Sequence, residues 1–253
     1  MKKIIGFVMA AIMGISMTAC GSKSSSEDTL IVGTEAAFAP YEYIAGNEIV
    51  GIDMDIAQAI AEAMGKKLEI KNMDFDGALL AVQQGKVDFV AAGVSVTEAR
   101  EKNMDFSDYY VDSTDVIVVN AASPAVSGAG ELNGKVIGVQ QGNVADLWCS
   151  DKENVEAKEI KRYTAFAQAA QDLLNQKIDC IVMDQVPAKE LVEATEGLAV
   201  LEGEKNVLFS DQYAIAVKKG NQQLLEEINT VLADLKESGK MDEIFTKYLS
   251  QEE

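Results

Sequence analysis

One arginine is the first residue in this sequence to suggest a specific chemistry. Arg100 closes the stretch GVSVTEAR, residues 93–100, and it is one of only two arginines in a chain that has 20 lysines. Arginine offers a planar, permanently charged fork that matches a carboxylate or a phosphate, whereas lysine offers a point charge. We expect Thr97 to cap the helix that contains Arg100. The stretch suggests recognition of an anion, although an ordinary surface arginine is the alternative.

The chain lacks the residues and motifs of most catalytic and metal sites. It has no histidine, which removes the commonest general base and metal ligand. It also has no Cys-x-x-Cys pair, no Walker loop and no Gly-x-Ser-x-Gly elbow. These absences favour a binding protein over an enzyme, with no metal ion and no cofactor. Cys149 and Cys180 could form a disulfide, but buried free thiols are the expected state.

The N-terminus indicates export. Residues 1–19 join a positive start to a short apolar run, which predicts a signal peptide rather than a membrane-spanning helix. The sequence Met-Thr-Ala-Cys at residues 17–20 resembles a bacterial lipobox, in which Cys20 carries the lipid; an ordinary signal peptide with an incidental cysteine is the alternative. The Ser-rich stretch that follows, up to residue 28, predicts a flexible tether. We therefore expect an extracytoplasmic protein anchored to the cell membrane by an N-terminal lipid.

The charge excludes one class of partner. The net charge is −19, and removal of residues 1–19 leaves 20 basic against 41 acidic residues, or −21. Such a surface repels phosphodiester backbones, so we expect no nucleic-acid partner.

The first part of the chain alternates strands and helices. Asp53 is expected to cap one helix that stops at Gly65, and Asp76 to open another that Gly85 ends. The intervening apolar segments predict strands at 29–35, 66–73 and 86–93. Strands separated by single helices predict parallel pairing with right-handed crossovers.

A second unit follows the same order of elements. Residues 134–141 and 177–185 predict strands, a helix starts near 143, and Thr164 is expected to cap the next helix. The stretch GKVDFVAAG at 85–93 aligns with QKIDCIVMD at 176–184. Chance similarity is the alternative, but the match predicts two similar α/β lobes.

Two extended apolar segments, 113–122 and 212–220, predict two crossings between these lobes, and two tail helices separated by Gly239 return to the first lobe. A chain that leaves one lobe and comes back forms a two-strand hinge, and ligands of such sheets bind beyond the carboxyl ends of the strands. We expect an α/β protein with a ligand cleft between the lobes. The predicted first lobe comprises 29–115 and 213–253, and the second comprises 116–212.

The mature chain resembles the extracytoplasmic solute-binding proteins of polar amino-acid ABC transporters, which have the type II periplasmic-binding-protein fold. The resemblance extends from GTEAAFAPYEY to SGKMDEIFTKYL, and its most specific part is SVTEAREKNMDFSDYY. It implies a monomer with two partners: a free polar amino acid, most simply arginine, lysine or glutamine, and an ABC transporter permease.

The resemblance also implies how the ligand's carboxylate is held. Arg100 matches the arginine that grips the α-carboxylate. Ser95 would add a hydroxyl and Gly93 a close main-chain approach. The amides of Gly142 and Asn143 would face the anion from a helix start, although Asn143 departs from the family's usual threonine.

The remaining contacts follow from the same resemblance. Asp184 matches the acceptor for the α-ammonium; the alternative is that it caps the helix starting near Pro187. Phe38 and Phe75 match aromatic residues that sandwich the ligand's side chain, with core packing as the alternative for each. Glu35 and Gln140 match positions at the side-chain tip. Two other functions stay open, an enzyme such as a cyclohexadienyl dehydratase and an amino-acid sensor subunit.

Overall fold

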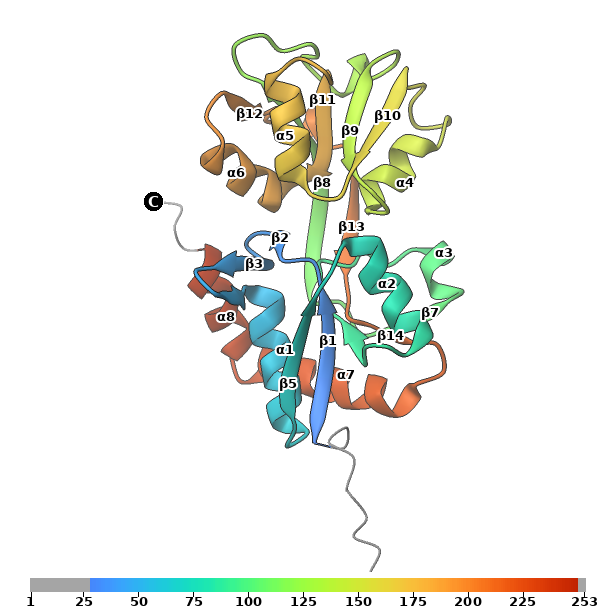
Figure 1. The fold of residues 1–253 in the computed structure, drawn as a ribbon, viewed down its shortest axis with the longest axis vertical. Coiled ribbons are helices and arrows are strands. Elements are labelled where there is room, and N and C mark those ends of the chain that lie inside the picture. Colours follow the sequence, from blue (N-terminus) through green and yellow to red (C-terminus); the bar gives the residue numbers. More distant parts are fainter. Residues whose placement is uncertain (1–27, 250–253) are drawn as a thin grey trace, which may run out of the picture.

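The computed structural model describes residues 28–249, which form two large sheets and one small sheet. Figure 1 shows one sheet with its helices in each half of the molecule, which we call lobe 1 (lower) and lobe 2 (upper). The predicted signal peptide, Cys20 and nearly all of the tether lie outside the described residues. Within 28–249, no helix has both the length and the apolar character that a membrane span requires.

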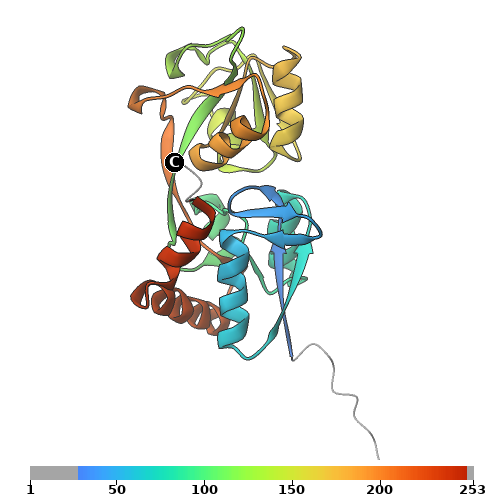
Figure 2. The same cartoon turned by 90° about the vertical axis from the view of Figure 1, so that its left-hand side faces the viewer.

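Lobe 1 contains a sheet with the strand order β5-β1-β6-β14-β7. The strands β1, β5 and β6 pair in parallel, as the alternation of strands and helices predicts. A separate small sheet, β2-β3-β4, lies on the side that faces lobe 2 (Figures 1 and 2). The elements are β1 (Thr29–Thr34), β2 (Ala37–Phe38), β3 (Glu42–Ala45), β4 (Glu48–Val50), α1 (Ile52–Ala63), β5 (Lys67–Asn72), α2 (Phe75–Gln84), β6 (Phe89–Val90), α3 (Glu98–Glu101), β7 (Met104–Phe106) and β14 (Ala216–Lys218).

Lobe 2 contains a sheet with the order β10-β9-β11-β8-β12, and β13 pairs with β8 beside this path. Here β9 pairs in parallel with both β10 and β11. The elements are β8 (Val111–Asn120), η1 (Ala129–Glu131), β9 (Val136–Gln140), α4 (Val144–Ser150), β10 (Glu159–Tyr163), α5 (Phe166–Leu174), β11 (Cys180–Asp184), α6 (Gln185–Ala194), β12 (Leu198–Val200), η2 (Glu204–Asn206) and β13 (Phe209–Tyr213).

Two antiparallel strands connect the lobes. Both β8 and β13 run between the two halves in Figure 1, and Val111 pairs with Tyr213 at the lobe 1 end. The predicted crossing at 212–220 is in fact two strands: Tyr213 ends β13 in the sheet of lobe 2, and Ala216 begins β14 in the sheet of lobe 1. The structure therefore has the predicted pair of crossings.

The chain ends on lobe 1 with α7 (Gln222–Glu237) and α8 (Lys240–Leu249), which pack against α1 (Figure 2). Gly239 separates the two helices with a φ of +78°, a left-handed conformation that glycine adopts without strain. This agrees with the predicted break between the tail helices.

The internal sequence match corresponds to the same local structure in both lobes. The side chain of Asp88 accepts a hydrogen bond from the amide of Ile31 at 2.7 Å, and Asp179 accepts one from Val136 at the same distance. The preceding turns also agree, because Gly85 and Gln176 both have a positive φ. The aspartate just before β6 therefore ties that strand to β1 in lobe 1, and the aspartate just before β11 ties that strand to β9 in lobe 2.

Three predicted helix caps are wrong. The N-cap of α1 is Gly51, that of α2 is Asp74 and that of α5 is Ala165, in place of Asp53, Asp76 and Thr164. Asp53 lies instead in the first turn of α1, fully buried, where it accepts hydrogen bonds from the amide of Gly93 and the hydroxyl of Tyr110. Long-range partners decide its position, and a local capping pattern contains no information about them.

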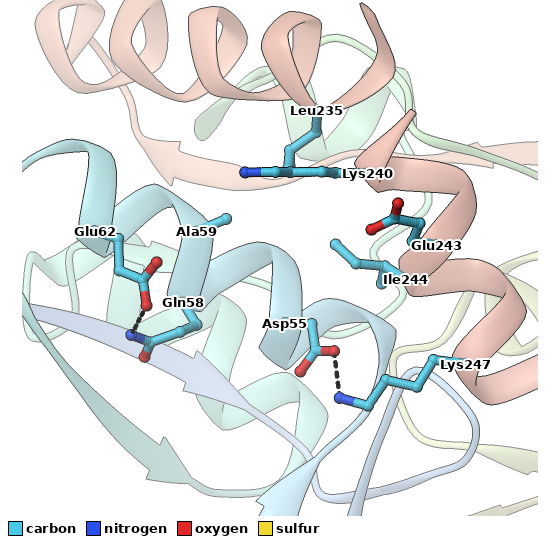
Figure 3. Close-up of a pocket in the computed structure, with 9 residues that line it drawn as sticks. All are labelled: Asp55, Gln58, Ala59, Glu62, Leu235, Lys240, Glu243, Ile244 and Lys247. Carbon is cyan, nitrogen blue, oxygen red and sulfur yellow. Dashed lines mark hydrogen bonds and ion pairs between the residues drawn. The ribbon is translucent and has the colours of Figure 1, made fainter. Parts of the chain in front are cut away.

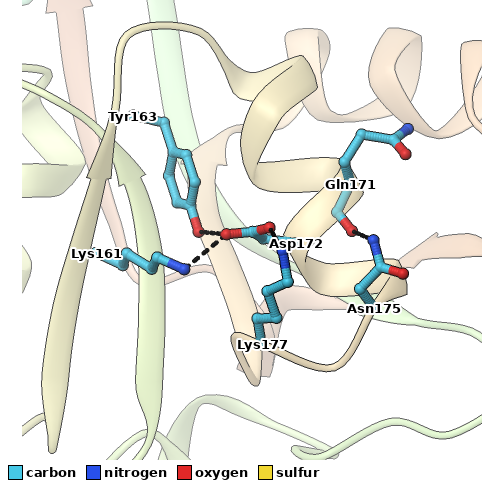
Figure 4. Close-up of polar contacts among 6 residues, drawn as sticks. All are labelled: Lys161, Tyr163, Gln171, Asp172, Asn175 and Lys177. Carbon is cyan, nitrogen blue, oxygen red and sulfur yellow. Dashed lines mark hydrogen bonds and ion pairs between the residues drawn. The ribbon is translucent and has the colours of Figure 1, made fainter.

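One acid holds helix α5 to the edge of the sheet of lobe 2. The carboxylate of Asp172 accepts hydrogen bonds from Lys161 at 2.6 Å, Tyr163 at 2.9 Å and Lys177 at 2.9 Å (Figure 4). These hydrogen bonds hold the pKa of Asp172 well below its usual value, and the bond from Lys161 has the largest effect. These contacts fix the loop after Tyr163, which carries lobe 2 residues to the boundary between the lobes.

Candidate functional site

Arg100 is held at the boundary by a short helix. The hydroxyl of Thr97 accepts the Arg100 amide at 3.2 Å and caps α3, which confirms the predicted cap. The guanidinium is buried, lies 5.3 Å from the ring centroid of Phe75 and donates to the carbonyl oxygen of Ser95 at 2.5 Å. Its other terminal nitrogen donates to the carbonyl oxygen of Gly142, in lobe 2, at 2.7 Å. Burial lowers the pKa of Arg100 to about 10, so the side chain stays charged at neutral pH.

Among the described residues, the guanidinium of Arg100 donates to carbonyl oxygens and to no carboxylate. A buried guanidinium is most stable when it faces an ionised acceptor, and a carboxylate forms shorter and stronger hydrogen bonds than a carbonyl does. The surface-arginine alternative is therefore wrong, and the environment of Arg100 suits an anionic ligand group.

Asp184 ends β11 on the lobe 2 side of the boundary. It is buried, and one carboxylate oxygen accepts hydrogen bonds from the hydroxyls of Ser113 and Tyr213. The other oxygen has no hydrogen-bond partner among the described residues. Burial, followed by the charge of Asp211, raises the pKa of Asp184 to about 6. A cation near Asp184 would therefore stabilise the ionised form of its carboxyl group.

The alternative role for Asp184, as the N-cap of the next helix, is correct in position but not in hydrogen bonding. Asp184 occupies the N-cap position of α6, which begins at Gln185, but its side chain forms no capping hydrogen bond.

Aromatic rings meet across the boundary. Phe38, from β2 in lobe 1, stacks on Phe166, from α5 in lobe 2, with ring centroids 6.1 Å apart. Phe38 also stacks on Tyr41, and Phe75 lies beneath the Arg100 guanidinium. Both predicted aromatic residues are buried and belong to hydrophobic clusters, so core packing is observed for each, and their contact with a ligand stays a prediction. The sequence prediction missed Phe166, which the alternation of elements could only have placed inside a helix.

Gly93 is the residue that allows Phe38 to lie so close to the sheet. Its φ is +53°, and a β-carbon there would lie 2.7 Å from a ring carbon of Phe38. A larger residue would displace the aromatic ring, so glycine at this position fixes the shape of the boundary.

Glu35 and Gln140 also meet across the lobes. The amide nitrogen of Gln140 donates to Glu35 at 3.1 Å and to the carbonyl oxygen of Thr164 at 3.2 Å. Both side chains are buried. Burial raises the pKa of Glu35 to about 7, while the hydrogen bond from Gln140 opposes that shift. The sequence prediction placed these two residues together, and the structure brings them into direct contact.

The loop at Gly142 and Asn143 contributes both donors and an acceptor. The amide of Gly142 donates to Asp146 at 3.1 Å, and that of Asn143 donates to the carbonyl oxygen of Gln140 at 3.2 Å. The side chain of Asn143 caps α4 by accepting the amide of Ala145 at 3.0 Å. In this structure both amides therefore have acceptors within lobe 2.

A second pair of residues, missed in the sequence, closes over the same loop. Gln141 donates to Asp76 of lobe 1 at 2.8 Å. Gly142 has a φ of +76°, and a β-carbon there would lie 1.8 Å from a carboxylate oxygen of Asp76. Spacing could not have linked residues 65 positions apart, because only the closed approach of the two lobes brings them together.

These contacts define one site between the lobes. A cavity of about 200 Å³ opens there beside Phe38, Phe166, Met183 and Pro187. Another cavity, of about 350 Å³, lies between α1, α7 and α8 of lobe 1 and contains none of the predicted site residues (Figure 3). The charged and polar residues of the predicted site therefore lie at the boundary between the lobes and not at the cavity of Figure 3.

Known proteins resemble the chain along nearly its whole length. The family model of bacterial extracellular solute-binding proteins, family 3, matches residues 30–251. The arginine-binding extracellular protein ArtP of Bacillus subtilis is 27% identical over 259 residues, which cover 100% of both chains.

Solved structures agree with this similarity. A crystal structure of a mutant of ArgBP from T. maritima has a TM-score of 0.82 and 37% identity, covering 89% of this chain and 97% of that one. An ancestral arginine-binding protein bound to glutamine has a TM-score of 0.79 and 36% identity, covering 88% and 99%. The predicted two-lobed α/β fold is thereby confirmed.

Proposed function

The chain belongs to the bacterial extracellular solute-binding proteins of family 3, and from that premise we propose that it captures a polar amino acid between its lobes. The observation that carries the proposal is a pair of buried, oppositely charged groups at the boundary. Arg100 lies beside the lobe 2 carbonyl of Gly142, and Asp184 ends a lobe 2 strand with one carboxylate oxygen unpaired. A free amino acid has one negative and one positive group, which these two side chains can hold separately.

The ligand's side chain would extend along the aromatic rings toward Glu35 and Gln140. Phe38 and Phe75 present apolar faces suited to an alkyl stem. The carboxylate of Glu35, with no cationic partner among its hydrogen bonds, would face the tip. A cationic tip favours the ionised form of Glu35, whereas a neutral amide can donate to either form. The ligand class that fits is arginine or lysine, with glutamine as the neutral member.

Binding would stabilise the closed arrangement of the lobes. The first lobe, 29–115 and 213–253, supplies Arg100, Ser95, Gly93 and the aromatic residues; the second, 116–212, supplies Asp184 and the loop at Gly142 and Asn143. A ligand that contacts both lobes binds the closed form more tightly than the open form, so it shifts the population toward closure. The two strands β8 and β13 are the natural hinge for this motion, because they are the segments that connect the sheets.

The N-terminus would place the receptor at a membrane. A lipid on Cys20 and the Ser-rich tether would hold the lobes close to an ABC transporter permease, to which the closed, loaded receptor delivers the amino acid. The relative ArtP is named as an extracellular protein, which supports an extracytoplasmic location. The compared relatives are binding proteins, which favours this function over an enzyme or a sensor subunit.

A thermal-shift screen of the delipidated protein against the common amino acids tests the proposal. A ligand that binds only the folded form raises the melting temperature, by an amount that grows with its concentration. We expect arginine, lysine or glutamine to give the largest increase. A response confined to sugars, peptides or metal ions would exclude the proposed function.

A further inference from the structure

Three acidic side chains from three strands of lobe 2 converge on one face of the sheet. Asp184 of β11 lies directly opposite Asp115 of β8 in the antiparallel ladder. On the other edge of β8, Asp211 of β13 lies opposite Ser113, two residues before Asp115. Residues opposite each other, and residues two apart along a strand, point to the same face. One carboxylate oxygen from each acid lies within 4.8 Å of the other two.

The innermost acid has nothing to balance it. Asp115 is fully buried, and neither of its carboxylate oxygens has a hydrogen-bond partner among residues 28–249. The second oxygen of Asp184 is in the same condition. A buried polar group without a partner destabilises the folded protein, and a charged one does so more strongly. Like charges directly opposite each other in a sheet add to that cost.

Among the described residues, Arg100 acts on the cluster through its charge but forms no hydrogen bond to it. Asp211 and Asp184 both act electrostatically on Arg100, but its terminal nitrogens donate to the carbonyl oxygens of Ser95 and Gly142.

We propose that Asp115, Asp184 and Asp211 form a binding site for a divalent cation of the size of Ca²⁺. The ligand atoms are all carboxylate oxygens, which hard cations prefer. Calcium binds oxygen at about 2.3–2.6 Å, so oxygens on opposite sides of the ion lie about 4.6–5.2 Å apart. The three oxygens lie within 4.8 Å of one another, so one ion of this size can contact all three. Mg²⁺, at about 2.0–2.1 Å, needs a tighter arrangement.

The cluster can be reached by an ion and by water. A cavity of about 690 Å³ is lined by Asp211, Ser113 and Val144, so the outermost acid faces it directly. Calcium takes six to eight ligands. Three carboxylates supply part of this number, and water from the cavity can supply the remainder. Binding of a divalent ion would favour the ionised form of the three carboxyl groups, and their negative charges would balance that of the ion.

The site shares one residue with the proposed amino-acid site. Asp184 has a single unpaired oxygen, and both a metal ion and an α-ammonium group would use it. The two cations would therefore compete, so saturating Ca²⁺ should lower the affinity for the amino acid. This coupling rests on the proposed function, whereas metal binding itself does not.

Calorimetry with Ca²⁺ alone, on full-length protein previously treated with a chelator, tests the proposal. We expect one ion per chain with a dissociation constant of about 0.1–1 mM, the range of weak extracellular calcium sites. D115N and D211N should each weaken binding about tenfold or more. D112N is the matched control, since Asp112 is an exposed acid on the same strand and should leave Ca²⁺ affinity unchanged.

Two outcomes would overturn the cation site: no saturable binding in the wild-type protein up to about 10 mM Ca²⁺, or equal affinity in D115N and D112N. Circular dichroism checks the fold of each variant, and D211N keeps the test decisive if D115N does not fold. Amino-acid binding measured separately in the presence of EDTA distinguishes failure of the metal site from failure of the proposed function.

Discussion

A side chain of lobe 1 holds the main chain of lobe 2: the Arg100 guanidinium donates to the carbonyl oxygen of Gly142 at 2.7 Å. The fork that is proposed to bind the ligand therefore also connects the lobes. Gly142 has a positive φ, and its loop carries a further connection through Gln141 and Asp76. Ligand recognition and closure thus depend on the same few atoms, which several substitutions can test.

Replacement of Arg100 by alanine should abolish detectable amino-acid binding. Truncating one partner of a buried charged hydrogen-bonded pair costs about 2–5 kcal/mol, or roughly 30-fold to several thousandfold in affinity. R100K should retain a charge but lose the two-pronged geometry and so bind with intermediate affinity. Isothermal titration calorimetry measures both variants. K247A, which removes an ion pair between α8 and α1, is the control and should bind normally. Unchanged affinity in R100A, with the fold intact, would refute the role of this residue.

Replacement of Glu35 by glutamine should change which ligand is preferred. If the ionised carboxylate faces a cationic tip, E35Q removes a charge-assisted interaction, and arginine affinity should fall by about tenfold or more. Glutamine affinity should fall less, because an amide can donate to the new side-chain oxygen. E62Q, an exposed substitution on α1, is the matched control. Equal losses for the two ligands would show that Glu35 does not contact the tip.

The same carboxylate predicts how stability depends on pH. Burial raises the pKa of Glu35 from 4.5 to about 7, so between these values the folded protein holds a proton that the unfolded chain has released. The contribution of Glu35 to the free energy of unfolding is then largest below pH 4.5 and falls as the pH rises to about 7. Its full size is on the order of 3 kcal/mol.

Urea unfolding of the ligand-free protein between pH 4 and 8 measures this contribution. E35Q lacks the titrating group, so the wild-type protein should lose stability relative to E35Q as the pH rises. A constant difference between the two proteins across this range would mean that Glu35 titrates normally. The comparison cancels the contributions of buried acids that do not interact with Glu35; Glu42, whose pKa the charge of Glu35 helps to raise, is the exception.

Much of the fold could be predicted because it follows from local patterns. The parallel strands of both lobes follow from the apolar periodicity of the sequence. The capping of α3 follows from the hydroxyl of Thr97, three residues before the amide that it accepts. The internal sequence match predicted two similar lobes, and the equivalent bonds of Asp88 and Asp179 agree with it.

The remaining features depend on contacts between distant residues. The position of Asp53 is decided by Gly93 and Tyr110, 40 and 57 residues away. The stacking of Phe38 on Phe166 and the pairing of Asp76 with Gln141 exist only because the lobes meet. The family resemblance named Arg100 and Asp184, but it gave no indication of Asp115 and Asp211, which strand register brings close to Asp184.

Replacement of Gly142 by alanine should hinder closure. The backbone there has a φ of +76°, and the added β-carbon would lie 1.8 Å from Asp76, so the substitution combines backbone strain with a clash between the lobes. G134A is the matched control, since Gly134 has a φ of +71° in the same lobe with nothing within 4 Å.

Both variants should lose about 1 kcal/mol of stability from backbone strain, but only G142A should bind amino acid more weakly. Calorimetry measures the affinity, and small-angle scattering should show a larger radius of gyration for G142A with ligand. In the double variant G142A/D76A, the clash is removed, and affinity should recover in part. Equal affinities of G142A and G134A would contradict a steric role for this glycine.

The two buried cysteines should be inert in the native protein. Cys149 and Cys180 are both buried and free, which agrees with the thiol state expected from the sequence. Burial raises the pKa of Cys180 to about 12 and that of Cys149 well above its usual value, so almost no thiolate forms at neutral pH. The thiolate is the reactive form of cysteine. In protein that lacks Cys20, a thiol reagent should therefore modify neither residue while the protein is folded, and should modify both after denaturation in guanidinium. Addition of the amino-acid ligand should slow any residual reaction, since a bound ligand stabilises the folded form against the unfolding that exposes these thiols. Rapid modification of the folded protein, or an intact mass lower by about two hydrogens that indicates a disulfide, would contradict this prediction.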